Sequence, residues 1–407
     1  MSSALSKLHS TDHSVIGDKL TTLAICWPRF GPYHLARIDA CAKAFRGEIS
    51  VVGIETSPTE SVYAWPDTPI EDRSWTHLKA GDKINIGQLL TRLSPDVVTV
   101  NGWGFSDSRR VLRWAIQNKR GIILFSDSRP GDHPIRCHTE WIKRRLVPLC
   151  ESAVVAGQAH ADYLTSLGLA SSRIFVGLDV VDNHHFASGK QFARPVAVEK
   201  LLGKSPYLLS ISRFVEKKNL HRLIDAFSLA VPNLLDQSTK LLFVGDGELK
   251  DSLIRHVHHN QLQNKVAFLP FQHYENLPAI YGNATAFVLP STMDQWGLVV
   301  NEAMAAGCPV AVSNRCGCAA ELIVPGYNGE QFDPLDIHSI AESLLRLLNA
   351  DNLRLDSLKT NAEITIMNWG VDRFANAVRS AIGVATGTRK PEKFTDKIFL
   401  NALGIVP

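Results

Sequence analysis

The sequence predicts an α/β protein built from two parallel sheets, and three features of the 407-residue chain predict it. Short apolar runs alternate with amphipathic stretches, which is the pattern of parallel strands covered on both faces by helices. This alternation stops at residues 190–206 and restarts at residue 207. The length also exceeds that of most single domains. We therefore expect two Rossmann-like units, residues 1–196 and 197–369, that face each other across a cleft.

The first unit is expected to alternate strands with helices. Its apolar runs predict strands at 20–27, 49–55, 96–102, 121–127 and 152–157, and residues 173–183 are expected to form a strand and its exit loop. Amphipathic stretches between them predict helices at 35–45, 84–94, 107–120, 139–150 and 160–169. Residues 56–88 are otherwise irregular, with room for short edge strands.

The second unit repeats the same alternation. Strands are predicted at 207–213, 240–247, 265–271, 285–291 and 308–312. Helices are predicted at 219–230, 248–260, 297–306, 336–349 and 352–364, and residues 368–383 form a further amphipathic stretch. The strand at 240–247 ends in Gly245-Asp246-Gly247, a tight turn that lacks the third glycine of a dinucleotide fingerprint. A dinucleotide-binding oxidoreductase is therefore not favoured.

Composition narrows the class of protein. A hydrophobic content of 45% with 20% charged residues is that of an ordinary soluble protein. The net charge of +3 is too small to predict a nucleic-acid partner. Seven cysteines without framework spacing favour a reducing cytosol, and no run of eighteen apolar residues predicts a membrane span. The pair Cys316 and Cys318 has no second ligand pair nearby, so we expect loop cysteines and no metal site.

The polar loop 291–295 is the first candidate site. It follows an apolar run and precedes the predicted helix 297–306, so it lies at the carboxyl edge of the sheet, where ligands bind in open α/β folds. The N–H groups that open the helix suit a phosphate. Asp294 in the loop and Glu302 in the helix could hold hydroxyls of a sugar and a ribose. Helix capping explains Asp294 equally well but does not explain Glu302.

Two cations follow the first strand of the second unit. Arg213 ends that strand and Lys218 precedes the next helix, so both lie at the same edge as the loop. Converging cations stabilise the charge that builds on a diphosphate leaving group. The alternative is a solvated basic loop, which also accounts for Lys217.

The first unit offers weaker candidates. Gly31 precedes a helix and would allow a ligand phosphate or sugar to approach closely, unless it only forms a turn. The strand end Ser126 to Arg129 contains Asp127, which could orient or deprotonate a hydroxyl or could cap a helix. Asn101 to Trp103 ends another strand on the same side.

A series of motifs spans residues 207–335 of the second unit. They are SRFVEKKNL (212–220), FVGDGEL (243–249), VAFLPF (266–271), AFVLPS (286–291) and WGLVVNEAMAAGCPVAVS (296–313), followed by Gly317, Glu321, Gly326 and Gly329. In this order and spacing, the second unit resembles family 4 of the nucleotide-sugar glycosyltransferases. The resemblance implies a retaining enzyme of the GT-B fold, whose C-terminal helix, about 370–407, returns to the first domain.

The resemblance also implies roles for individual residues. Arg213 and Lys218 match the family's diphosphate-binding pair, and Glu302 matches the carboxylate that holds the ribose. Asp294 stands where the family has a sugar-binding glutamate. Phe271 would lie near the base. The backbone of the segment that follows Asp294 would lie along the diphosphate and sugar: Gln295, Trp296, Gly297, Leu298 and Val299.

The first unit departs from the family. The family histidine near the anomeric carbon is missing from the stretch NGWGFSDS (101–108). Either Asp127 or His133 replaces it, or the site works without a side-chain equivalent. The resemblance implies no cofactor besides a UDP- or GDP-linked sugar. The acceptor would be a small molecule, glycan or lipid-linked sugar, and the sequence leaves the oligomeric state open.

A basic group of residues predicts either peripheral contact with the inner face of the membrane, as in relatives with lipid acceptors, or a solvated surface: Arg109, Arg110, Lys143, Arg144 and Arg145. Two other functions stay open. One is a non-catalytic binding or scaffold protein on a degenerate transferase. The other is an inverting transferase or sugar-nucleotide epimerase on the same fold.

Overall fold

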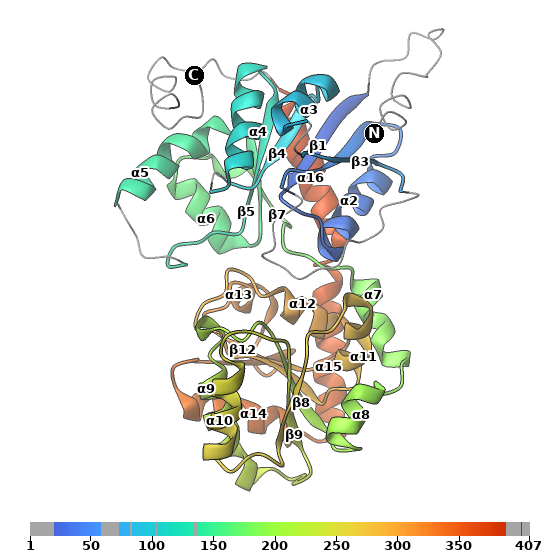
Figure 1. Cartoon of the computed structure of the whole chain (residues 1–407), viewed down its shortest axis with the longest axis vertical. Helices are drawn as coiled ribbons and strands as arrows, with labels where there is room; N and C mark the ends of the chain where they lie inside the picture. The colour runs from blue at the N-terminus through green and yellow to red at the C-terminus, as the bar shows by residue number, and fades with distance from the viewer. Residues whose placement is uncertain are drawn as a thin grey trace.

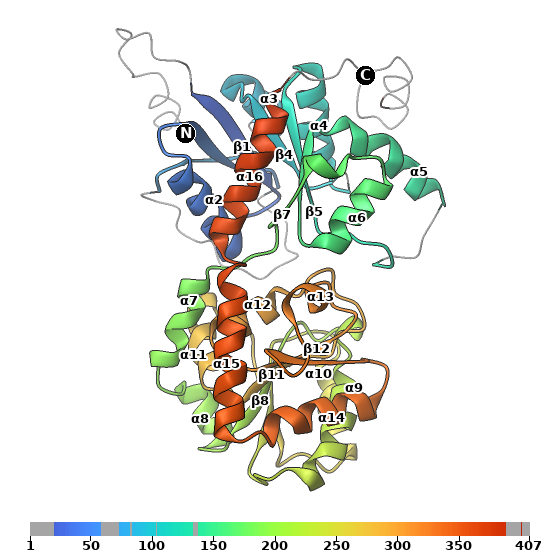
Figure 2. The ribbon, with the colours of Figure 1, turned by 180° about the vertical axis from the view of Figure 1, so that it is seen from behind.

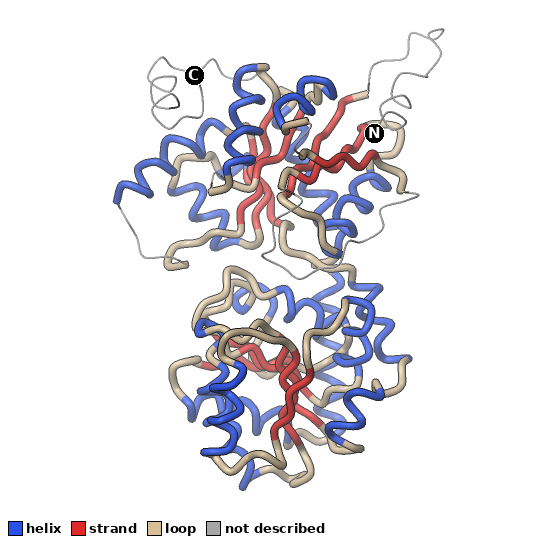
Figure 3. Tube along the Cα trace, in the orientation of Figure 1, coloured by secondary structure: helices blue, strands red, loops and turns tan. Residues whose placement is uncertain are grey.

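The computed structural model consists of two α/β domains stacked along the long axis of the molecule (Figure 1). It describes residues 20–57, 73–81, 84–102, 104–132, 137–387 and 400. The candidate His133 lies outside these residues. Figure 3 shows strands inside each domain with helices around them. In the part of the chain that the structure describes, no helix is long and apolar enough to cross a membrane.

The first domain is built on a seven-stranded parallel sheet in the order β3-β2-β1-β4-β5-β6-β7. The order reverses direction beside β1, the switch point where α/β sheets bind ligands. The strands are β1 (Thr21–Trp27), β2 (Ile49–Glu55), β3 (Thr76–Lys79), β4 (Val97–Val100), β5 (Gly121–Ser126), β6 (Ser152–Val155) and β7 (Ile174–Val176). These match the predicted strands, and β3 is a short edge strand within 56–88.

Alternate residues of these strands face opposite layers. Leu23 and Ile25 pack with α2 (Pro32–Ala44) and α16 (Val371–Ala385). Ala24 and Cys26 pack on the other side with α3 (Ile86–Leu93), α4 (Ser106–Gln117) and α6 (Gln158–Ser166). Helix α5 (Cys137–Leu146) lies at the rim of this layer (Figure 1).

The second domain is built on a six-stranded parallel sheet in the order β10-β9-β8-β11-β12-β13. Its strands are β8 (Tyr207–Ile211), β9 (Lys240–Val244), β10 (Val266–Leu269), β11 (Ala286–Leu289), β12 (Val310–Ser313) and β13 (Gly329–Phe332). The first five confirm the predicted strands. The sequence did not predict β13, because GEQF lacks an apolar run.

Helices again cover both faces. One layer contains α9 (Leu220–Ala230), α10 (Lys250–His259) and α14 (Ile337–Leu348). The other contains α7 (Asn183–Ala187), α8 (Val196–Leu202), α11 (Leu277–Gly282), α12 (Leu298–Ala305) and α15 (Asn352–Met367). Helix α13 (Ala319–Leu322) lies on the side that faces the first domain (Figure 1).

The chain crosses between the domains twice, and the two crossings lie side by side. One leads from β7 to α7, and the other leads from α15 into α16, which returns to the first sheet (Figure 2). Val181 and Gly370 form a parallel bridge where they meet. Helix α7 begins at residue 183 and already packs on the second sheet, whereas the boundary at residues 196 and 197 stays a prediction.

Candidate active site

The loop between β11 and α12 lies at the interface of the two domains. Gly297 precedes the helix with φ +106°, a left-handed conformation that favours glycine. The segment 316–318 holds the loop from the other side, because Gly317 N–H donates to the carbonyl of Asp294 (3.0 Å) and Cys318 N–H donates to that of Trp296 (3.1 Å). Cys316 and Cys318 are buried free thiols beneath the loop. The C-x-C pair therefore has a packing role here.

Lys218, which follows β8, forms an ion pair with Asp294 of this loop. Their side chains are each 13% exposed, and Ser291 Oγ donates to the same carboxylate at 3.0 Å. Lys218 ends the 3-10 helix η4 (Glu216–Lys218), and Thr292 N–H donates to the carbonyl of Lys217 (2.9 Å), which holds the two loops together. The structure therefore pairs two predicted site residues, of which Lys218 is expected to bind the diphosphate of the donor and Asp294 its sugar.

Four other predicted donor residues lie at the same edge of the second sheet as this pair. Arg213 is exposed just beyond the end of β8, at the same carboxyl edge of the sheet. Phe271 is 45% exposed beyond the end of β10. The N–H groups of Leu298 and Val299 open helix α12, where a phosphate would be favoured. Their roles in donor binding stay predictions.

The side chain of Trp296 takes a structural place instead. It is buried, its Nε1–H donates to Asn301 Oδ1 at 2.9 Å, and its ring lies 5.0 Å from that of Trp369. The buried side chain is not accessible to a ligand, and the prediction used only the backbone of Trp296. Trp369 lies at the domain junction, next to the bridge between Val181 and Gly370.

Glu302 lies in a buried cluster with two tyrosines. Its side chain is 1% exposed, and its two carboxylate oxygens accept hydrogen bonds of 2.8 Å from Tyr33 and from Tyr281. Tyr33 belongs to the first domain and Tyr281 to the second, so the cluster bridges the interface. Burial raises the pKa of Glu302 to about 7, although both tyrosine hydroxyls oppose that rise.

This buried carboxyl predicts a pH dependence of stability. The pKa of Glu302 is raised from 4.5 to about 7, so between these values the folded state binds more protons and stability falls as pH rises. We expect Glu302→Gln to remove this fall in stability with rising pH. From pH 4.5 to 7.5 the free energy of unfolding of the variant should rise by about 3 kcal/mol relative to that of wild type, measured by urea unfolding at each pH. A constant difference across this range would contradict the burial of an ionisable carboxyl.

Gly31 is the N-cap residue of helix α2, and both its N–H and its carbonyl form hydrogen bonds within the first turn. Its N–H donates to His34 Nδ1 at 3.0 Å, and its carbonyl accepts from the N–H groups of His34 and Leu35. Burial lowers the pKa of His34 to about 3, so the imidazole is neutral and able to accept that hydrogen bond. The predicted approach of a phosphate to Gly31 stays a prediction.

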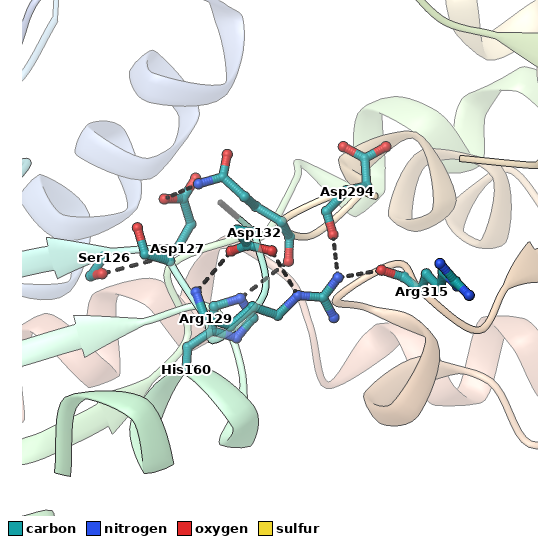
Figure 4. A network of polar contacts seen from close by, with 9 residues as sticks. Ser126, Asp127, Arg129, Asp132, His160, Asp294 and Arg315 are labelled. Atoms are coloured by element: carbon teal, nitrogen blue, oxygen red, sulfur yellow. Dashed lines mark hydrogen bonds and ion pairs between the residues drawn. The ribbon is translucent and has the colours of Figure 1, made fainter. Parts of the chain in front are cut away.

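Asp127 contacts the second domain, because Gln295 Nε2 donates a hydrogen bond of 3.3 Å to the Asp127 carboxylate. Burial raises the pKa of Asp127. Behind it, Arg129 crosses the interface (Figure 4). Its Nε donates to Asp132 at 3.1 Å, and its Nη2 donates to the backbone carbonyls of Asp294, at 2.9 Å, and Arg315.

His160 is a contact that the sequence did not indicate. It is fully buried, and its Nε2 lies 3.1 Å from the carbonyl of Gln295. Next to it, the N–H of Gln158 donates to Glu321 of the second domain. His160 opens an ordinary amphipathic helix in the sequence, so only the tertiary structure places it at the site.

A cavity of about 600 Å³ lies beside these contacts, between the two domains. The first domain lines it from the loop after β5 and from α6, and the second domain lines it from the 291–295 loop and Arg315. The lining residues are Arg129, Pro130, Gly131, Asp132, Ala159, Asp162, Tyr163, Ser166, Thr292, Met293 and Arg315. The cavity therefore opens next to Asp294.

Two Rossmann-like domains joined by a returning C-terminal helix define the GT-B fold. Solved structures with this fold are similar over most of the chain. A trehalose-phosphate synthase from Burkholderia vietnamiensis has a TM-score of 0.72 and 14% identity, covering 92% of this chain and 100% of that one. Anabaena HepE in complex with UDP-glucose has a TM-score of 0.67 and 18% identity, covering 89% and 99%.

The sequence similarity lies in the second domain. Residues 195–364 match the family model of glycosyl transferases group 1. The chain is 34% identical over 143 residues to an uncharacterised glycosyltransferase of Methanocaldococcus jannaschii, and 30% identical over 155 residues to the Staphylococcus aureus capsular polysaccharide biosynthesis glycosyltransferase CapM. These matches cover 35% and 38% of this chain and 35% and 40% of the relatives.

Proposed function

We propose that the protein is a retaining glycosyltransferase that moves a sugar from a nucleotide diphosphate-sugar to an acceptor hydroxyl. The observation that carries this proposal is the Lys218–Asp294 pair beside the N-terminus of α12. There a cation, a carboxylate and free helix N–H groups lie together at the domain interface. The group 1 family match supports the proposal, as does HepE, which has been solved with UDP-glucose.

In this proposal Arg213 and Lys218 hold the diphosphate. Lys218 has three N–H donors, so it can keep its bond to Asp294 while it donates another to a phosphate oxygen. Asp294, held from its other side by Ser291, then binds a hydroxyl of the transferred sugar. The pair would thus fix the sugar against its leaving group, which is where positioning lowers the barrier.

The reaction needs no protein nucleophile. The bond from the anomeric carbon to the phosphate oxygen breaks, the bond to the acceptor oxygen forms on the same face, and the acceptor proton passes to the leaving phosphate. The two cations stabilise the charge that develops on that phosphate. Asp127 orients the acceptor hydroxyl from the first domain. The proposal uses no metal ion and no cofactor besides the donor.

The cavity beside Asp294 is the acceptor site in this proposal. Asp132, Asp162 and Arg315 offer polar contacts, while Tyr163 and Met293 offer apolar ones. This mixture suits a sugar or another polyhydroxylated compound, either free or as the head of a glycan or lipid-linked acceptor.

We further propose a cytoplasmic protein with a peripheral membrane contact. The exposed rings of Phe105 and Trp141 lie in or beside the helices that carry the predicted basic group. Part of that group is already engaged, since Arg110 pairs with Asp107, and Lys143 pairs with Glu140. The surface is therefore less basic than the sequence alone suggests.

A non-catalytic binding protein is the second candidate. The observation that favours it is that Asp294 and Glu302 both already have partners within the chain. Nuclear magnetic resonance of the products from a UDP- or GDP-sugar with candidate acceptors separates the proposals. A product whose new glycosidic bond keeps the anomeric configuration of the donor supports the retaining enzyme. The opposite configuration indicates inversion, and donor binding without turnover indicates the binding protein.

Donor binding is expected to stabilise the folded chain. At 100 times its dissociation constant, the matching nucleoside diphosphate among UDP, GDP and ADP should add about 2.7 kcal/mol and raise the melting temperature. Arg213→Ala should abolish this shift, whereas Arg255→Ala, an exposed arginine on α10, should keep it. No shift with any nucleotide would contradict the proposal.

A further inference from the structure

Glu302, the carboxylate that the resemblance to family 4 assigns to the donor ribose, is not accessible in this structure. Glu302 is 1% exposed, and each of its oxygens accepts a tyrosine hydroxyl at 2.8 Å. A ribose hydroxyl that binds Glu302 must therefore take the place of one of these tyrosines.

The two tyrosines are not equivalent. Tyr281 lies in α11 of the same domain, is 0% exposed and packs in the core with Phe287, their rings 5.6 Å apart. Tyr33 is only partly buried and comes from the second position of α2 in the other domain. Its ring packs against the outside of the same core cluster and lies edge-on to Tyr274, with the ring centroids 5.5 Å apart, so its departure uncovers less of the core than that of Tyr281 would.

Helix α2 is hydrogen-bonded to the segment where the chain crosses between the domains. Arg37, one turn after Tyr33, is buried and donates through Nε and Nη2 to the carbonyl of Val180, at 3.1 and 2.9 Å. Val181 pairs with Gly370 at the point where both chain crossings meet. Tyr33 is thus carried by a helix that is anchored at the junction, so rotation there would move it relative to Glu302.

We propose that Tyr33 competes with the donor ribose for Glu302, and that it acts as a latch between the domains until a nucleotide displaces it. This inference rests on the proposed function. The hydroxyl of Tyr33 lowers the donor's affinity, because a protein whose binding-competent state is only partly populated binds more weakly by that fraction. Tyr33 is therefore a residue that sets donor affinity rather than a catalytic residue.

The test is isothermal titration of the full-length protein and of Tyr33→Phe with UDP and with GDP. The substitution removes one hydroxyl and keeps the ring, so the fold should be retained. We expect the dissociation constant of the bound nucleotide to fall about tenfold, because a hydrogen bond to a carboxylate no longer opposes binding. Tyr281→Phe is the matched control, and it should not tighten binding, since Tyr281 does not lie between the domains.

A second ligand separates a latch from a residue that orients Glu302. In wild type, the 2′,3′-dideoxy analogue can bind without displacing Tyr33, so it should bind only slightly more weakly than the ribonucleotide. In Tyr33→Phe the dissociation constant of the dideoxy analogue, divided by that of the ribonucleotide, should rise about tenfold. A ratio that falls, or weaker nucleotide binding by Tyr33→Phe, would overturn the latch while leaving the proposed function intact. If neither UDP nor GDP bound to either chain, the proposed function would fail and the latch with it.

Discussion

Replacing Lys218 with alanine is expected to lower kcat/KM for sugar transfer by about two to three orders of magnitude. That is the range lost when one preorganised donor to developing charge is removed. Lys218 also neutralises Asp294, so the substitution leaves a carboxylate facing the diphosphate. The measurement is the initial rate of nucleoside diphosphate release in the presence of acceptor, over a range of donor concentrations.

Lys217→Ala provides the matched control. The two lysines are neighbours in η4, but Lys217 contributes its backbone carbonyl to the loop contact with Thr292, which the substitution preserves. Its rate should stay within about twofold of wild type, in keeping with the small effect of most surface substitutions. Equal losses for both variants would indicate a general effect of net charge and would contradict a specific role for Lys218.

Replacing Gly317 with alanine is expected to cost about 3 kcal/mol of stability, at the upper end of the range for forced backbone shifts. A Cβ at this position would lie 1.7 Å from the carbonyl oxygen of Gln295, which also accepts from His160. The loop must therefore move away from segment 316–318 and from the first domain. The melting temperature should fall by roughly 6–12 °C, and donor binding should weaken because Asp294 moves with the loop.

Gly383→Ala is the control for this substitution. Gly383 lies in α16 on an exposed position, and a Cβ there would meet no atom within 4 Å. Alanine is the better helix former, so this variant should be as stable as wild type or more stable by about 0.5–1 kcal/mol. If Gly317→Ala had the same melting temperature as Gly383→Ala, the close approach of Gln295 to Gly317 would be contradicted.

The fold could be predicted because its signal is local. A parallel strand covered on both faces is a short apolar run, and each such run in the two domains gave a strand within a few residues of the predicted bounds. β13 is the exception. Its sequence, GEQF, has little apolar surface, and its pairing with β12 rather than its composition makes it a strand.

The candidate site was predictable where sequence order places residues at one sheet edge. Lys218 and Asp294 follow β8 and β11, which are neighbours in the sheet, so both had to lie at the same edge. The departure of Asp294 from the family's glutamate was also visible in the sequence. What could not be read there is that the two side chains pair with each other.

The order of apolar and amphipathic segments predicts both sheets apart from β13, and it places the loop 291–295 at the edge of the second sheet. Only the tertiary structure decided the partners across the domain interface: Tyr33 on Glu302, Arg129 and His160 on the backbone of the loop, and Gln295 on Asp127. The physical reason is the range of each effect. Hydrophobic periodicity acts within a few residues of the chain, whereas these hydrogen bonds join groups 135 to 269 residues apart, whose meeting depends on how two finished domains pack.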